Sequence, residues 1–326
     1  MQLLHETNYF AYNENVTKPI KILVLSDLHY SDLISKKRLD WILRKIAEIN
    51  PDYIFFCGDM IDSVDDISEN LYTWWTSLNQ IAQGLISIGS HDYWRGWIDS
   101  ETGKLKFECV YPVEFFERLN ALNHVCVLNN ENYQDDYIFA TGYTQSIRYY
   151  YSMGINFETH EFERKTANKI IPEDKDVMIS ELTKLLEQNR EILTSKETAK
   201  KMKFLLAHAL TYGFDTDVSK LFTQYNYVIG GHSHNGLVPP IINELWPTTI
   251  GFILPDRSKL QPNVRNTLRN KGDKVIVNGP LTTFQKCSGI KAKLNAFYPS
   301  NITVLTIAND KVYDTEKIYT KQRYTR

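Results

Sequence analysis

A chain of 326 residues, of which 43% are hydrophobic, is long enough and apolar enough to bury the core of one large domain or two ordinary ones. Its net charge of −2 excludes a broad basic field for phosphate backbones, so nucleic acid is unlikely as a partner and is expected only as a substrate. Four widely spaced cysteines exclude a disulfide scaffold, and the first twenty residues carry no secretory pattern. Because no apolar run approaches the roughly 20 residues that a bilayer requires, we expect a cytoplasmic protein.

The first predicted element is a buried strand that ends in chemically active residues. Ile20–Leu25 is a short apolar run rich in β-branched residues, and the letters SDLHY, with Asp27 and His29, follow it. A helix is predicted over Ser35–Ile49, until Asn-Pro stops it, and Tyr53–Cys57 is the next strand. This order of strand, helix and strand predicts two parallel neighbours whose carboxyl ends meet at one edge of a sheet.

Three further strands are predicted to end in histidine-containing motifs. After a helix over Asp65–Ile81, the strand Leu85–Ile88 runs into GSHD. The strand Lys203–Ala207 runs into His208, and Tyr227–Ile229 runs into GGHSHNG. Because open α/β sheets bind ligands at such edges, this coincidence indicates a functional site. The remaining predicted elements are a helix over 113–122 and strands over 125–128, 137–140, 274–277 and 302–307.

We expect a single domain over 1–326 with two irregular regions. The segment 144–202 leads from a tyrosine cluster through a charged stretch into a helix over 174–193, and we interpret it as an insertion that covers one side of the fold. The segment 245–274 is a proline-containing loop that is apolar at first and basic at its end. A solvated charged loop is the preferred interpretation, and peripheral contact with an anionic membrane surface through 245–274 is the alternative.

Imidazole and carboxylate groups gather at the predicted strand ends. The set comprises Asp27, His29, Asp59, His91, His208, His232 and His234. A mixed set of this kind suits Zn, Mn or Fe, whereas a site for Mg or Ca would be richer in oxygen. Two cations roughly 3.5 to 4 Å apart would hold a water between them, lower its pKa and clamp both ends of an in-line displacement at phosphorus. We therefore expect two divalent metal ions, with Asp59 able to bridge them.

The ordered series DLH, GD, GSHD, AH and GGHSH resembles the motifs of the calcineurin-like metallophosphoesterases over Lys21–Gly236. The resemblance implies an α/β fold of four layers, in which two mixed β-sheets pack face to face with helices outside. It also implies the ligands of both metals. The first metal would be held by Asp27, His29, Asp59 and His234, and the second by Asp59, His208 and His232.

The GSHD motif contains the expected catalytic residues and one departure from the family. The resemblance places His91 against the substrate, where it would stabilise charge on the phosphoryl oxygens or protonate the leaving oxygen, with Asp92 orienting its ring. Ser90 stands where the family has an asparagine that gives a carbonyl oxygen to the second metal. A serine hydroxyl reaches less far and binds a cation more weakly, so we predict weakened retention of the second ion. Asp62 has two equal interpretations, as an acceptor for a ligating histidine and as a helix cap.

These features favour a metal-dependent phosphohydrolase that cleaves a phosphomonoester or a phosphodiester by attack of a hydroxide bridging two metal ions, without a covalent enzyme intermediate. Two alternatives stay open: a catalytically weak scaffold that binds a protein partner, which Ser90 favours, and a peripheral-membrane phospholipid or nucleotide-lipid phosphodiesterase. A nuclease is disfavoured because the sequence has no broad basic surface. The sequence leaves the substrate, the physiological metals and the oligomeric state open.

Overall fold

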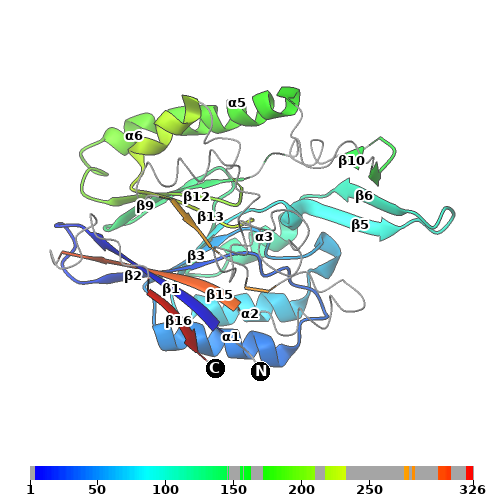
Figure 1. Ribbon diagram of the computed structural model, residues 1–326, viewed down its shortest axis with the longest axis horizontal. Coiled ribbons are helices and arrows are strands. Elements are labelled where there is room, and N and C mark those ends of the chain that lie inside the picture. Colours follow the sequence, from blue (N-terminus) through cyan, green and yellow to red (C-terminus); the bar gives the residue numbers. More distant parts are fainter. Residues whose placement is uncertain are drawn as a thin grey trace, which may run out of the picture.

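The chain folds into four stacked layers in this computed structural model (Figure 1). The structure describes residues 4–144, 146, 155–156, 158–162, 172–209, 217–232, 275–278, 281–282, 300–309 and 321–325. Within these residues, a layer of helices, a seven-stranded sheet, a five-stranded sheet and a second layer of helices follow one another. This arrangement confirms the four-layer α/β fold expected from the sequence.

The larger sheet is mixed. Its strand order is β16 (Lys321–Thr325), β1 (Leu4–Tyr12), β15 (Ser300–Ala308), β2 (Ile20–Leu25), β3 (Tyr53–Cys57), β4 (Gln83–Ser87) and β7 (Val125–Val127). Strands β2, β3, β4 and β7 run parallel, as their helical connections predict, and β15 is antiparallel to β2. All of β3 is buried, because layers cover both faces of the sheet, and this explains its continuous apolar sequence.

Three helices cover the outer face of this sheet, and their apolar sides form one cluster with it. They are α1 (Lys36–Ile49), α2 (Glu69–Asn79) and α3 (Val113–Asn120). Helix α1 begins after Ser35, whose hydroxyl accepts a hydrogen bond from a backbone N–H of the first turn, and it ends at Asn50 in the left-handed conformation. The helix predicted over 65–81 is shorter than expected, because Val64–Asp66 forms a separate 3-10 turn and α2 begins only after Ser68.

The smaller sheet is also mixed and is covered by helices on its outer face. Its strand order is β14 (Val275–Val277), β13 (Tyr227–Gly230), β12 (Met202–Ala207), β9 (Ile138–Tyr143) and β8 (Asn132–Gln134). The helix predicted over 174–193 is found as α5 (Pro172–Gln188) and α6 (Arg190–Thr194). The buried cluster between these helices and the sheet includes Met178, Leu182, Phe139 and Leu205. That the segment 144–202 is an insertion stays a prediction.

A second apolar cluster lies between the two sheets and holds them face to face. The rings of Phe55 on β3 and Phe204 on β12 meet edge to face, with centroids 5.1 Å apart. Cys57 at the end of β3 belongs to the same cluster, so its thiol lies in the core as expected. The packing of these central strands fixes the distance between their carboxyl ends, where the polar motifs begin.

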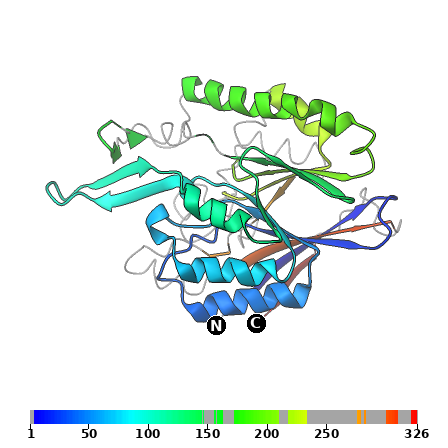
Figure 2. The ribbon, with the colours of Figure 1, turned by 180° about the vertical axis from the view of Figure 1, so that it is seen from behind.

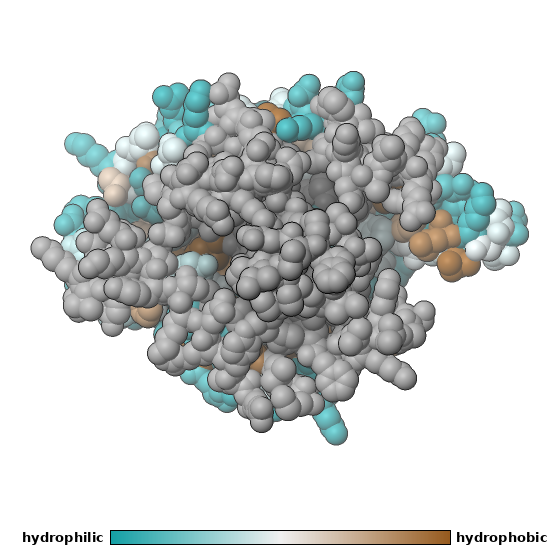
Figure 3. Space-filling view, in the orientation of Figure 1, coloured by the Kyte–Doolittle hydropathy of each residue, from teal (hydrophilic) through white to brown (hydrophobic). Residues whose placement is uncertain are grey.

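A hairpin arm, which the sequence does not predict, projects from the body beside these strand ends (Figures 1 and 2). It consists of β5 (Trp94–Ile98) and β6 (Leu105–Cys109), extended by β11 (Glu161–Phe162) and β10 (Ile155–Asn156) into a four-stranded sheet. Ile98 and Leu105 pair across the hairpin and are 64% and 49% exposed. Figure 3 shows apolar atoms on the arm.

Several expectations fall outside the described residues. The loop 245–274, with its proposed membrane contact, and the ligand position His234 both lie there. Among the residues that the structure does describe, no helix combines the length and apolarity needed to cross a membrane. The cytoplasmic location stays a prediction.

Candidate metal centre

The predicted site residues that the structure describes meet where the carboxyl ends of both sheets come together. Asp27 and His29 follow β2, Asp59 follows β3, and the GSHD motif follows β4, all in the larger sheet. His208 follows β12 and His232 follows β13 in the smaller sheet. The centre is therefore built across the interface between the sheets, as the positions of the motifs after successive strands predict.

Asp59 and His208 form its central contact. The Nε2 atom of His208 lies 2.8 Å from Oδ2 of Asp59, and both side chains are almost fully buried. The Nδ1 atom of His208 donates to the carbonyl oxygen of Cys57, which fixes the orientation of the ring. His232 continues the group, with its Nδ1 atom 3.1 Å from Nε2 of His208.

Asp27 and His29 form the other half of the centre. The Nε2 atom of His29 lies 3.9 Å from Oδ1 of Asp27 and 3.9 Å from Oδ2 of Asp59. The backbone N–H of His232 lies 3.2 Å from both carboxylate oxygens of Asp27. The carboxylates of Asp27 and Asp59, the ring of His29 and the backbone N–H of His232 thus lie close together in one small volume.

The donor atoms form two groups that share Asp59. Ligand atoms of Asp27, His29 and Asp59 lie within 4.8 Å of one another, and so do those of Asp59, His208 and His232. Buried carboxylates are costly unless they are paired or bind a cation, and nitrogen mixed with oxygen suits a transition metal. The donor set therefore fits divalent metal ions.

The charges in the centre depend on the contact between Asp59 and His208. Burial alone would raise the pKa of the Asp59 carboxyl, but the imidazoles of His208, His91 and His29 hold that pKa well below its usual value. Burial alone would lower the pKa of His208, but the charges of Asp59 and Asp27 raise it to about 9. Without a metal, Asp59 and His208 therefore form a buried ion pair.

Glycines in the motifs allow the loops to approach closely. A Cβ atom on Gly58 would lie 2.6 Å from Cα of Gly89 and 2.8 Å from Cβ of His208, and Gly58 also has φ of +77°. A Cβ atom on Gly89 would lie 2.2 Å from the backbone nitrogen of Asp59. A Cβ atom on Gly231 would lie 2.6 Å from Oδ2 of Asp27. Only residues without a side chain fit at these positions.

The backbone is strained at four of the predicted ligand positions. Asp27, His29, Asp59 and His232 have φ of 54°, 43°, 54° and 63°, in the left-handed region that residues other than glycine rarely adopt. Such conformations cost free energy and persist where the surrounding structure holds them. The sharp turns after the strands direct side chains from four loops into one centre.

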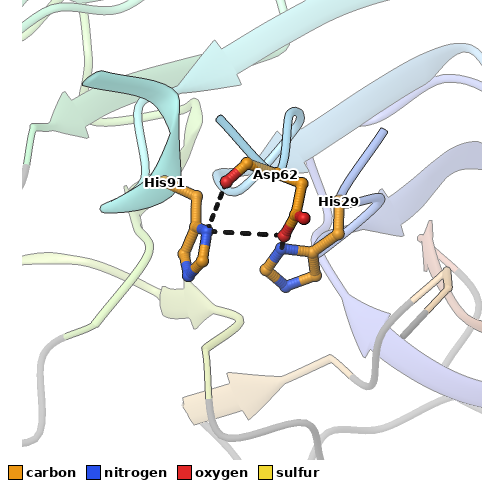
Figure 4. A group of neighbouring side chains, drawn as sticks. All are labelled: His29, Asp62 and His91. Carbon is orange, nitrogen blue, oxygen red and sulfur yellow. Dashed lines mark hydrogen bonds and ion pairs between the residues drawn. The ribbon is translucent and has the colours of Figure 1, made fainter. Parts of the chain in front are cut away.

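His91 is held at the edge of the centre by Asp62 (Figure 4). Its Nδ1 atom donates to the carbonyl oxygen of Asp62 over 2.9 Å. The carboxylate oxygen Oδ1 of Asp62 lies 3.7 Å from Nδ1 of His91 and 3.7 Å from Nδ1 of His29. The structure thus favours the interpretation of Asp62 as a partner of histidines, since the helices that follow it begin after Ser63 and Ser68.

The carboxylate of Asp92 is engaged by backbone groups, and its expected role of orienting His91 stays a prediction. Its carboxylate accepts hydrogen bonds from the backbone N–H groups of Met60, Ile61 and Gly89, at 2.7, 3.2 and 2.8 Å, and it binds the loops together. Burial and the charge of Asp59 raise the pKa of Asp92 to about 6. The neighbour of the His91 ring at Nδ1 is Asp62, through its carbonyl oxygen and its carboxylate.

Ser90 lies within the centre, where the sequence places it. Its side chain is buried, and its hydroxyl donates to Oδ1 of Asp59 over 3.4 Å. The backbone N–H of His91 donates to the same oxygen over 2.8 Å. Ser90 therefore contacts the shared carboxylate.

One support of the centre is absent from the sequence prediction. The backbone N–H groups of Leu281 and Thr282 donate to the carbonyl oxygens of Ser26 and Asp27, and the Asn278 amide contacts the Ser26 hydroxyl. This segment after β14 holds the loop that carries Asp27. The sequence gives no signal for this support. The segment lies about 250 residues from the loop that it contacts, and most of its hydrogen bonds to that loop come from the backbone.

Comparison with known proteins decides the family. The model of the calcineurin-like phosphoesterases matches residues 20–236. This chain belongs to the calcineurin-like phosphoesterase family. The match contains every motif described above.

Curated relatives match over a shorter stretch. An uncharacterised metallophosphoesterase of Campylobacter jejuni is 27% identical over 82 residues, which are 25% of this chain and 22% of that protein. One from Helicobacter pylori is 27% identical over 88 residues, which are 26% of this chain and 23% of that protein. The alignments thus span less than a quarter of the relatives' own length.

Solved structures resemble the chain remotely. The protein TT1561 of Thermus thermophilus has a TM-score of 0.40 at 12% identity and covers 66% of this chain and 83% of its own. A dimetal phosphatase from Danio rerio has a TM-score of 0.33 at 11% identity and covers 67% of this chain and 82% of its own.

Proposed function

We propose that this metallophosphoesterase hydrolyses a phosphomonoester or phosphodiester by direct in-line attack of a water-derived hydroxide on phosphorus, with two divalent cations bound. The observation that carries the proposal is the position of Asp59, which belongs to both groups of donor atoms. Divalent cations held there would supply Lewis-acid chemistry, because they would lower the pKa of a bound water and neutralise charge on the phosphoryl oxygens. Mn, Fe and Zn suit the mixed donor set, and His234 is proposed to complete the first group.

The residues of the chain have separate roles in this proposal. Asp27, His29, Asp59, His208 and His232 hold the cations, and Ser90 contacts the shared carboxylate. His91 interacts with Asp62 through Nδ1, and we assign Nε2 on the other side of the ring to the phosphoryl or leaving oxygen. Direct attack agrees with the burial of Cys57 in the core, where its thiol has no access to a substrate.

Two experiments test this proposal. A screen for phosphate release from nucleotides, phospholipids and sugar phosphates in the presence of Mn²⁺ would identify the substrate class, and we expect turnover of at least one class. A substrate with chiral phosphorus would then test the mechanism. Direct attack gives inversion, whereas net retention would require a covalent intermediate and would contradict the proposal.

Ser90 supports a second candidate function, a catalytically weak scaffold that binds a protein partner. A weakly held second cation would lower turnover while leaving the surface of the protein intact. The buried carboxylates and histidines argue against this candidate, because they destabilise a protein that does not use them. Hydrolysis of bis-p-nitrophenyl phosphate with Mn²⁺ separates the two candidates, since the scaffold would bind metal without turnover.

A further inference from the structure

Trp94 opens the hairpin arm directly after the GSHD motif, and its indole contacts the same carbonyl oxygen as His91. Its Nε1–H donates to the Asp62 carbonyl oxygen over 2.7 Å, and the Nδ1–H of His91 donates to that oxygen over 2.9 Å. A carbonyl oxygen has two lone pairs, so both are engaged by these two side chains. The Trp94 bond therefore fixes the direction of the carbonyl group that orients His91.

The rings of these residues are also in contact. The centroids of His91 and Trp94 lie 4.9 Å apart with planes at 71°, and those of His91 and His29 lie 4.7 Å apart at 87°. The imidazole thus packs edge to face against an indole and against a metal-ligand histidine. Rotation of His91 about its side-chain bonds would break these contacts as well as the bond to Asp62.

Trp94 is itself held by the arm. Its ring stacks on Phe107 of β6, with centroids 5.1 Å apart and planes at 14°, and Phe107 is buried in the larger core. Strand alternation places Trp97 on the opposite face of the hairpin, where its ring lies 5.7 Å from that of His160. The two tryptophans of β5 therefore differ in their contacts. Trp94 packs against His91, whereas the described contact of Trp97 is with His160.

We propose that Trp94 is a positioning residue for His91, whose indole N–H and ring hold the imidazole in the orientation that phosphoester hydrolysis requires. This inference rests on the proposed function, in which His91 acts on the phosphoryl or leaving oxygen. Such a group contributes roughly 10²- to 10⁴-fold to a rate when it is aligned. Loss of one orienting hydrogen bond should remove part of that factor.

A double-mutant cycle tests the inference. Trp94→Phe keeps an aromatic ring but removes the N–H, and we expect kcat on bis-p-nitrophenyl phosphate to fall roughly five- to tenfold at unchanged KM and metal content. In the His91→Ala background, Trp94→Phe should lower kcat no further, because the indole acts through the imidazole. Trp97→Phe is the matched control and should leave kcat unchanged.

Three outcomes would overturn the inference: the same loss from Trp94→Phe in both backgrounds, equal effects of the two tryptophan variants, or an unchanged kcat after His91→Ala. The ring signals of His91 in Zn²⁺-loaded, ¹³C-histidine-labelled protein provide a readout without turnover. Trp94→Phe should shift and broaden them, and Trp97→Phe should not. If the wild-type protein lacks turnover, the proposed function fails, and these signals alone then support or reject the role of Trp94.

Discussion

His208 and Asp59 lie 2.8 Å apart at their side-chain tips although they follow strands of different sheets. The contact joins β3 of the larger sheet to β12 of the smaller one, just beyond the core that packs the two together. Because Asp59 also belongs to the group formed by Asp27 and His29, this contact links both halves of the centre.

Metal binding should release a proton from His208. The pKa of its imidazole in the metal-free protein is raised to about 9, so the ring is protonated at pH 7.5, whereas a ligand must be neutral. The pKa of Asp59 is lowered, so its carboxyl is already ionised and contributes no proton. We expect at least about one proton released per chain at pH 7.5 and fewer above pH 9, measured by titration calorimetry in buffers of different ionisation enthalpy. Proton release that is absent at pH 7.5 would contradict the ion pair.

Asp59→Asn should remove both metals, because the carboxylate belongs to both donor groups. We expect the metal content after dialysis to fall to near zero and kcat with Mn²⁺ to fall by at least about 100-fold. Elemental analysis and turnover of an activated phosphodiester measure the two effects. Asp99→Asn, in the turn of the hairpin arm, is the control and should retain metal. Loss of a single metal ion with the other retained would show that Asp59 is not shared.

Ser90→Asn should strengthen retention of the second metal. The buried hydroxyl contacts Asp59, and an amide oxygen at this position would reach further and bind a cation better. We expect the affinity for the second ion to rise on the order of tenfold, measured by competition with a chelating dye. The same replacement at the exposed Ser100 should have no effect. A wild-type chain that keeps two metals through extensive dialysis, with no change in the variant, would count against the prediction.

Gly58→Ala should destabilise the protein by about 3 kcal/mol, because its Cβ would clash with Gly89 and His208 in a backbone with positive φ. Gly103→Ala isolates the backbone contribution. Gly103 also has positive φ, but an added Cβ would meet nothing within 4 Å, so we expect a loss of only about 1 kcal/mol. Urea unfolding of the metal-free proteins measures both. Equal losses would show that the loops can separate to admit a side chain.

The sequence predicts the order of strands and the residues at their ends because both depend on local signals. Tyr53–Cys57 is a continuous apolar run, and Ile20–Leu25 is apolar except for Lys21. The apolar residues of both strands are buried, and Asp27 and Asp59 follow the strand ends. The sequence does not predict the hairpin arm of β5 and β6, because its short strands mix aromatic, charged and glycine residues and show no clear apolar pattern. Strand β1 is not predicted either, because the strands that pair with it, β15 and β16, come from the other end of the chain.

The site shows where chain neighbours and spatial neighbours differ. Asp92 adjoins His91 in the sequence, yet its carboxylate binds backbone N–H groups of other loops, and Asp62 approaches the ring from 29 residues away. Neither the left-handed conformations of the ligand residues nor the support from Leu281 leaves a composition or spacing signal. Such features follow from the packing of two sheets, which a local pattern does not encode.

Removal and return of the metal test whether hydrolysis by this chain depends on two bound cations. The measurement is turnover of bis-p-nitrophenyl phosphate and p-nitrophenyl phosphate by the wild-type chain, first stripped of metal and then titrated with Mn²⁺ while bound metal is counted. We predict that turnover disappears on stripping and returns as the second equivalent binds. A chain that binds two equivalents of Mn²⁺ and hydrolyses neither ester nor any substrate of the phosphate-release screen, or one that hydrolyses them equally well without metal, would contradict the account.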